Sequence, residues 1–298
     1  MIFAKSGDVD FIQRVKNLKF SGFVHSTFNR TFNIFCQENS ELYTIACGQM
    51  DNGPNTIVIE ADSFEKLNLE VNDIVYSNHH ILYIGDKMAI TLERVENWES
   101  ILPTYPEDLN RLKINLNKMK SYIDIHGKSG GIKKALSQTP FEKEMSNLLE
   151  KRTNLLFSEL LKNRMSAALQ HAVSLIGLGP GLTPSGDDFL VGLFTILNMR
   201  HSPFISDHFF CEEVVKKAKD LTNDISFMAL KKASAGQVRE SIIVLVNSLI
   251  NGKENELILA LKNVLNIGSS SGTDIALGLI CGLEVNLFAG GKVCLYKR

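Results

Sequence analysis

The feature of this sequence that most constrains its fold is a pair of similar segments, each a serine-glycine pair followed by an apolar run. Residues 185–193 (SGDDFLVGL) and 271–279 (SGTDIALGL) align without a gap and share serine, glycine, aspartate, glycine and leucine at the same offsets. An apolar run with an acid in its first turn predicts a helix that begins near the serine. In each helix the acid, Asp188 or Asp274, would take the third helical position, as in a capping box.

Each of these helices carries a second glycine two turns further on, Gly192 and Gly278. Glycine inside a helix costs about 1 kcal/mol relative to alanine, unless another backbone must come close. We therefore expect the two helices to cross at these glycines. Their N-termini would then converge on one cavity, where free backbone N–H groups and hydroxyls could hold an anion.

The loop before the first helix is unusually rich in glycine and proline. Residues 177–186 read GLGPGLTPSG, in which the prolines fix φ and the glycines leave the backbone open to a ligand. We call residues 176–188 the first corner and residues 268–274 the second corner. The residues that we assign to substrate binding in them are Gly179, Gly181, Thr183, Ser185, Gly186, Ser271, Gly272 and Thr273.

Three aspartates in the corners, Asp187, Asp188 and Asp274, are the candidate catalytic residues. One capping acid satisfies a helix, so Asp187 is surplus; it could bind a cation such as Mg²⁺, orient a substrate amide, or act as a general base. No cofactor is required by the pattern. The alternative is that both segments are only well-capped buried helices and that Asp187 faces solvent.

The chain changes character near Pro103, where LPTYPEDLN places two prolines before acidic residues. Before this point short segments rich in β-branched and aromatic residues predict strands and a small barrel or sandwich. These segments are 20–28, 31–37, 42–47, 56–61, 73–77, 80–84 and 88–95. After it, apolar residues recur with the period of a helix.

Further helices are expected over 107–123, 141–160, 211–233, 238–250 and 254–265, with Gly236 and Gly252 as stops. Thr222 is expected to be an N-cap. The prediction is an α+β protein with a β-rich domain over residues 1–102 and a mainly helical domain over 103–298. Gly127-Lys128-Ser129 resembles the end of a P-loop, but the residue five positions before Gly127, where that motif requires a glycine, is Tyr122, so we reject that motif.

The whole chain is almost neutral, with 32 Lys and Arg against 33 Asp and Glu, so no global field would hold nucleic acid or an anionic membrane. Its five cysteines are scattered and form no C-x-x-C pair, which disfavours a disulfide framework and a zinc site. The first ten residues contain no apolar run of signal-peptide length. Together these features predict a cytoplasmic protein.

The first corner with the start of its helix, GLGPGLTPSGDDFLVG, resembles the signature of a bacterial family once of unknown function and labelled as a carboxylase. This family is associated with the AllH-type subunit of oxamate carbamoyltransferase. The supporting segments, spread over most of the chain, are His25-Ser26, Gly53-Pro54, Trp98, TNDISFMALKKASAGQ and SSSGTDIALGL.

The resemblance implies that oxalurate and phosphate give oxamate and carbamoyl phosphate, with the help of partner subunits. It also adds His25 and Ser26 to the candidate substrate-binding residues. All four compounds are small anions, which agrees with the proposed corner site. Two alternatives remain: a non-catalytic subunit that binds an anion or a partner chain, and a β-rich interaction module whose glycine loops are structural. Carboxyl transfer is disfavoured, because no biotin-type lysine motif or metal cluster is found.

Overall fold

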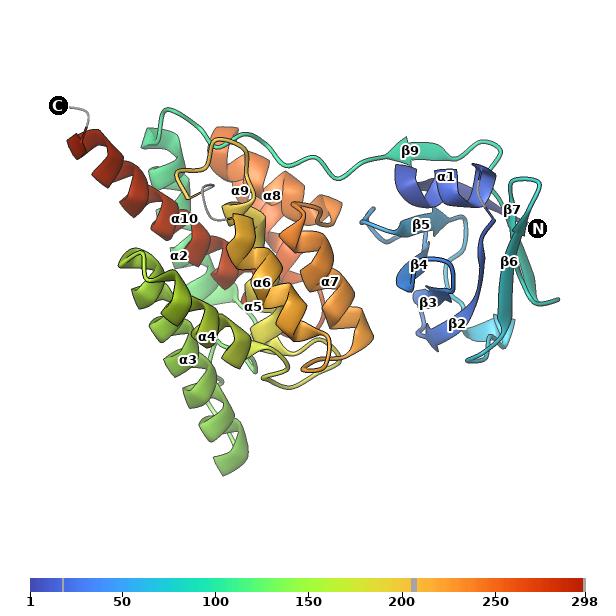
Figure 1. The fold of residues 1–298 in the computed structure, drawn as a ribbon, viewed down its shortest axis with the longest axis horizontal. Coiled ribbons are helices and arrows are strands. Elements are labelled where there is room, and N and C mark those ends of the chain that lie inside the picture. Colours follow the sequence, from blue (N-terminus) through green and yellow to red (C-terminus); the bar gives the residue numbers. More distant parts are fainter. Residues whose placement is uncertain (18, 205–207, 297–298) are drawn as a thin grey trace. The chain divides into compact units, whose positions relative to one another are not determined.

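A computed structural model describes residues 1–17, 19–204 and 208–296 of the chain. The chain divides into two compact units, Met1–Ser100 and Ile101–Arg298. Each unit has its own hydrophobic core. Figure 1 labels strands of the first unit and helices of the second. The protein belongs to the α+β class, as expected.

Eight strands of the first unit close into a β-barrel in the order β5-β4-β3-β2-β6-β7-β8-β1, because β1 also pairs with β5. The strands are β1 (Ile2–Asp8), β2 (Ser21–Thr27), β3 (Thr31–Cys36), β4 (Glu41–Cys47), β5 (Thr56–Ile59), β6 (Ile74–Asn78), β7 (Ile81–Ile84) and β8 (Met88–Thr91). A ninth strand, β9 (Glu96–Trp98), lies beside the second half of β1. Of the two predicted architectures, the barrel is therefore the one that forms.

The seven strands predicted from the sequence are all present, but β1, β9 and helix α1 (Val9–Asn17) were not predicted. Strand β1 is needed for closure, since it pairs with β5, β8 and β9. Helix α1 buries Phe11, Ile12 and Val15 in the barrel core. A short 3₁₀ helix, Glu65–Leu67, precedes β6.

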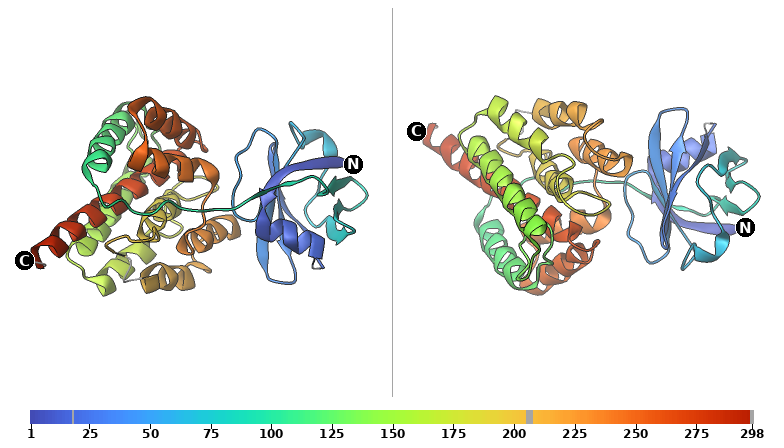
Figure 2. Two further views of the ribbon diagram at one scale, coloured as in Figure 1. Left: turned by 90° about the horizontal axis from the view of Figure 1, so that it is seen from above. Right: turned by 90° about the horizontal axis from the view of Figure 1, so that it is seen from below.

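The second unit is helical in the part of the chain that the structure describes. Its helices are α2 (Asn110–His126), α3 (Pro140–Leu161), α4 (Met165–Leu175), α5 (Ser185–Leu197), α6 (His208–Ala218), α7 (Asp224–Ser234), α8 (Glu240–Asn251), α9 (Glu254–Leu265) and α10 (Ser271–Tyr296). Helix α5 is buried along its whole length and packs along α10. Figure 2 shows α10, in orange to red, running through the helical unit. The two corner helices thus form the centre of the unit.

The single helix expected over 211–233 is wrong, because α6 and α7 are separated by residues 219–223. Asn223 is the N-cap of α7, with its side chain accepting from the Ile225 and Ser226 amides at 3.1 and 3.0 Å. Thr222 is therefore not the N-cap that we expected. Helix α4 was not predicted.

The stretch Ser271–Ala289 of α10 is long and apolar enough to cross a membrane, but 72% of it is buried within the protein. A helix in the core of a soluble protein shows the same length and composition. The apolar character of α10 is accounted for by its packing against α5.

Candidate functional site

Helices α5 and α10 cross at the two glycines that the sequence singled out. A Cβ added to Gly192 would lie 2.0 Å from the Ile275 carbonyl oxygen, and one added to Gly278 would lie 2.0 Å from the Phe189 carbonyl oxygen. Phe189 and Ile275 occupy equivalent positions in the two segments. The contact is therefore reciprocal, as around an approximate two-fold axis, and the predicted crossing is confirmed.

The two corners have the same backbone geometry. The Pro184 carbonyl accepts from the amides of Asp187 and Asp188, and the Ser270 carbonyl accepts from those of Thr273 and Asp274. Helix α5 has Pro184 as its N-cap, so Ser185 is its first helical residue. The expected Ser185–Asp188 capping box is wrong, because Asp188 lies one position too far along the helix.

Gly186 and Gly272 pack each corner against the helix before it. A Cβ at Gly186 would lie 2.0 Å from the Leu175 carbonyl oxygen, and one at Gly272 would lie 1.9 Å from the Val264 carbonyl oxygen. Their amides donate to preceding loop carbonyls at 2.8 and 3.0 Å. Most first-turn amides are thus already bonded, which corrects our expectation that they would be free for an anion. Among the corner residues that carry hydroxyl groups, Thr183 and Ser271 are only partly buried, whereas Ser185 and Thr273 are buried.

Two hydroxyl side chains, one from each corner, meet at Asp188. Thr183 Oγ1 donates to Asp188 Oδ2 at 3.0 Å and lies 3.0 Å from Ser271 Oγ. The Ser271 hydroxyl also bonds the Asp188 carboxyl. Asp188 is buried, whereas Thr183 and Ser271 are half-buried. Residues from the two sequence-predicted corners therefore lie together at Asp188.

Asp274 makes the equivalent contact in the opposite direction, because it lies beside Ser185 of the first corner. Its Oδ1 accepts from the Ile132 amide at 2.9 Å. Its Oδ2 and the Ser185 Oγ are both buried and have no hydrogen-bond partner of good geometry. Each corner thus directs its aspartate toward the serine of the other.

Burial raises the pKa of Asp188 to about 7, with a further contribution from the nearby Asp274 and Asp187 carboxylates, while Ser271 and Thr183 oppose the rise. Burial also raises the pKa of Asp274 to about 6, opposed by its bonds to Ile132, Ser185 and Ser270. The charged form of a carboxyl loses solvation when it leaves water. Both groups therefore exchange protons close to neutral pH.

We expect these raised pKa values to make the protein less stable as the pH rises from about 4 to about 7. A carboxyl whose pKa rises on folding stabilises the protein fully below its unfolded pKa, and this contribution is lost as the pH passes the folded pKa. For Asp188 the window runs from 3.8 to about 7, and for Asp274 to about 6. The asparagine side chains of Asp188→Asn and Asp274→Asn cannot ionise. The free energy of unfolding of each variant, relative to that of the wild type, should therefore be higher at pH 8 than at pH 5. Denaturant unfolding at both pH values measures this, and an unchanged difference would contradict it.

Asp187 points away from this cluster and makes structural hydrogen bonds. Its Oδ1 accepts from the Gly177 amide at 2.8 Å and its Oδ2 accepts from Thr222 Oγ1 at 2.5 Å. Ser226 of α7 lies beside it, and burial raises the pKa of Asp187. Asp187 is 1% exposed, so the alternative that it faces solvent is wrong. It joins the first corner to the connection between α6 and α7.

Replacing Asp187 with asparagine should therefore cost about 1–3 kcal/mol of stability, because an amide cannot accept both bonds and its NH2 group would face a donor. Thr222→Val should cost less. The double variant should be less destabilised than the sum of the two, since both changes remove one shared interaction. Denaturant unfolding of the four proteins measures this coupling, and strict additivity would show that the bond contributes nothing.

The remaining residues of the corners are placed as follows. Gly179 (φ 119°) lies against Ser185, whose amide nitrogen would be 2.7 Å from an added Cβ, and Gly181 (φ 98°) is exposed. Thr273 is buried, and its Oγ1 accepts from the Lys128 amide at 2.8 Å. The predicted binding roles of these residues stay predictions.

Residues 127–132, which were not among the predicted site residues, also contact the second corner. We call this segment the covering loop. It bonds Thr273 through the Lys128 amide and Asp274 through the Ile132 amide. The sequence of residues 127–131, GKSGG, is rich in glycine, which is the signal that could have indicated this loop; we had considered it only as a P-loop.

His25 and Ser26 belong to the barrel unit. His25 Nδ1 lies 3.2 Å from Ser26 Oγ, which accepts from Asn33 Nδ2 at 2.9 Å, and Thr44 Oγ1 donates to Asn33 Oδ1 at 2.8 Å. The register of β2 against β3 shifts between Val24 and Ser26, which marks an irregularity at His25. A polar chain thus crosses three strands, and the predicted substrate-binding role of His25 and Ser26 stays a prediction.

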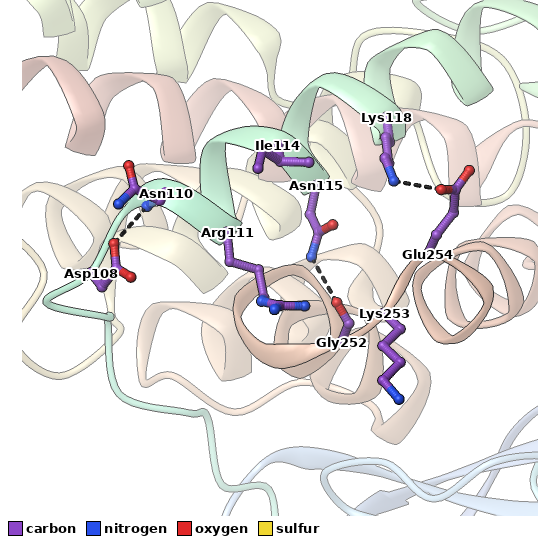
Figure 3. Close-up of a pocket in the computed structure, with 9 residues that line it drawn as sticks. All are labelled: Asp108, Asn110, Arg111, Ile114, Asn115, Lys118, Gly252, Lys253 and Glu254. Atoms are coloured by element: carbon purple, nitrogen blue, oxygen red, sulfur yellow. Dashed lines mark hydrogen bonds and ion pairs between the residues drawn. The ribbon is translucent and has the colours of Figure 1, made fainter.

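A pocket of about 460 Å³ lies elsewhere in the helical unit, between α2 and the connection from α8 to α9 (Figure 3). Asn115 projects into it and donates to the Gly252 carbonyl at 3.1 Å. It contains none of the sequence-predicted site residues. Among the described residues, no group of three or more His, Cys, Asp or Glu is placed to hold a metal ion.

Comparison with protein families finds two matches. Residues 175–283 match the family model described as oxamate carbamoyltransferase subunit AllH, and residues 3–97 match the AllH family N-terminal domain. The first match contains both corners and the glycine crossing, and the second covers the barrel. No solved structure matches the chain.

Proposed function

Since this chain belongs to the AllH family of oxamate carbamoyltransferase subunits, we propose that it binds the small anionic substrate of that enzyme where its two corners meet. The observation that carries the proposal is the meeting of Thr183 and Ser271 at Asp188. These groups come from different corners, and Thr183 and Ser271 are only partly buried. The positive ends of α5 and α10 add a favourable potential for an anion.

The proposed reaction transfers the carbamoyl group of oxalurate to phosphate. A phosphate oxygen bonds the carbamoyl carbon, the bond from that carbon to the oxamate nitrogen breaks, and the proton of hydrogen phosphate ends on that nitrogen. Negative charge develops on the carbamoyl oxygen, where the hydroxyls of Thr183 and Ser271 would stabilise it by turning away from Asp188 once that carboxyl has taken up the proton. No covalent intermediate on the protein is required.

We propose that Asp188 relays this proton. A carboxyl with a pKa of about 7 is present in both protonation states near neutral pH, so it can accept a proton from phosphate and donate it to the leaving nitrogen. Asp274 is assigned to orienting the substrate NH2 group. We propose no catalytic role for Asp187, because both of its carboxylate oxygens accept hydrogen bonds from neighbouring residues.

The proposal places the chain in a larger enzyme in the cytoplasm. The family description names a subunit, so other protein chains would complete the enzyme. Cys36, Cys47, Cys211 and Cys281 are unpaired, which suits a reducing compartment. We propose Mg²⁺ only as an ion that accompanies the phosphate, and we propose no nucleic-acid or membrane partner.

A thermal-shift titration tests the binding site. Phosphate, oxamate, oxalurate and carbamoyl phosphate are added to the full chain, alone and together with the other enzyme subunits. We expect at least one of them to raise the melting temperature of the wild type, and Ser271→Ala to weaken this effect. Ser234→Ala, whose hydroxyl bonds only its own helix at Lys231, is the matched control. No shift with any compound, with or without the other subunits, would refute the site.

The main alternative is a subunit that binds the anion without taking part in the reaction. In that case the Asp188 carboxyl would transfer no proton during the reaction. The alternative therefore predicts that ligand binding depends on Ser271, whereas turnover of the complete complex does not change when Asp188 is replaced. Measuring binding and turnover on the same variants separates the two.

A further inference from the structure

The covering loop, residues 127–132, is fastened to the second corner by its main chain. The Lys128 amide donates to Thr273 Oγ1 at 2.8 Å, and the Ile132 amide donates to Asp274 Oδ1 at 2.9 Å. Both acceptors lie in the first turn of α10 and are buried. These two bonds hold the loop against the corner, in addition to its own turn bond from the Gly130 amide to the Lys133 carbonyl at 3.0 Å.

Gly131 brings this loop into contact with polar atoms that the protein leaves unpaired. A Cβ at Gly131 would lie 2.1 Å from Asp274 Oδ2 and 2.6 Å from Ser185 Oγ. Ser185 is 1% exposed and Asp274 is fully buried; the Ser185 hydroxyl lies beside the Asp274 carboxyl, yet neither Ser185 Oγ nor Asp274 Oδ2 makes a hydrogen bond of good geometry. Leaving a buried polar atom unpaired costs about 1–3 kcal/mol. Of the two, the Ser185 hydroxyl is the group that can donate to a ligand oxygen at the junction of the two helix N-termini.

Lys128 supplies the charge that the corners lack. Residues 176–188 and 268–274 contain no lysine, arginine or histidine. Lys128 Nζ donates to the Gly268 carbonyl at 3.0 Å, at the start of the second corner. A lysine ammonium has three donors, so two are available to an oxyanion held at the same corner.

We propose that Lys128 binds an oxyanion of the substrate, its phosphate or carboxylate group, beside the N-terminus of α10, and that the covering loop holds this lysine in place. The inference rests on the proposed function and adds to it the residue that recognises the anion. GKSGG is not a P-loop, because it follows helix α2 and lacks the first glycine of that motif. It would nevertheless supply a lysine to a helix N-terminus that is contributed by another part of the chain.

The test measures phosphate and oxamate binding and the kinetics of the assembled enzyme for wild type, Lys128→Gln and Lys128→Arg. Loss of a charge-assisted bond should raise the KM for phosphate about 10- to 100-fold, with a smaller change in kcat. Arginine should restore much of the affinity. The salt dependence of KM should also weaken in Lys128→Gln, which a purely structural role would not cause. Lys134→Gln, which removes a surface ion pair with Glu150, is the control and should leave KM unchanged.

The outcomes separate this inference from the proposed function. If Ser271→Ala weakens phosphate binding but Lys128→Gln leaves KM and its salt dependence unchanged, the role of Lys128 is refuted and the corner site stands. A lowered melting temperature for Lys128→Gln with unchanged KM would likewise show that the lysine only stabilises the loop. If the wild type binds none of the four anions, with or without the other subunits, the proposed function fails and this inference falls with it.

Discussion

Replacing Gly192 with alanine will destabilise the helical unit by about 3 kcal/mol, at the upper end of the range for overpacked cores. The added methyl group would lie 2.0 Å from the Ile275 carbonyl oxygen, and that oxygen belongs to the backbone of a buried helix. The helices must therefore move apart along their whole contact. Alanine gains about 1 kcal/mol in helix propensity over glycine, which is too little to offset this separation.

Gly278→Ala should be similarly destabilising, because its methyl group would meet the Phe189 carbonyl oxygen at the same distance. The double variant should cost less than the sum, since helices already separated by one methyl group accommodate the second. Gly236→Ala is the control: at a φ of 74° and with only ordinary contacts, it should cost about 1–2 kcal/mol from backbone strain alone. Denaturant unfolding of the four variants measures these values. A cost for Gly192→Ala no greater than that of the control would contradict the close crossing.

Replacing Asp188 with asparagine will lower the turnover of the assembled carbamoyltransferase at least about 100-fold, the contribution of a well-placed acid-base group. The amide keeps the size of the side chain but cannot pass a proton. Its hydroxyl partners, Thr183 and Ser271, remain in place, so ligand binding should change much less than kcat. Steady-state kinetics in the direction that releases carbamoyl phosphate measures the effect.

The matched control is Asp10→Asn, which makes the same change in the first turn of α1 at an exposed position. It should leave kcat within about twofold, because surface substitutions have little effect beyond their own site. If Asp188→Asn retained full turnover while Ser271→Ala lost ligand binding, the relay would be wrong and the non-catalytic alternative would be favoured.

Much of the fold could be predicted from local sequence patterns. Seven strands of the barrel were predicted because their β-branched residues and turn signals are local. Strand β1 was not, because its role lies in pairings with β5, β8 and β9 that join distant parts of the chain. The break between α6 and α7 was also not predicted, since the helical period continues across it and Asn223 interrupts it as a cap.

The site was predicted in outline for a physical reason. Two glycines at equivalent helical positions, Gly192 and Gly278, carry an energetic cost that only a close backbone contact explains, so the crossing could be inferred before any coordinates. The roles of the neighbouring acids could not. Asp187 and Asp188 are adjacent in sequence, yet one bonds Thr222 and the other meets Ser271.

The sequence by itself therefore determined which two helices meet and at which residues, because a repeated motif and the cost of a helical glycine are properties of the chain. Only the tertiary structure decided what surrounds them: that Asp188 is shared between the corners, that Asp187 is structural, and that the covering loop reaches Asp274. These contacts join residues from helices and loops that are far apart in the sequence. Their partners depend on packing directions that local propensity does not contain.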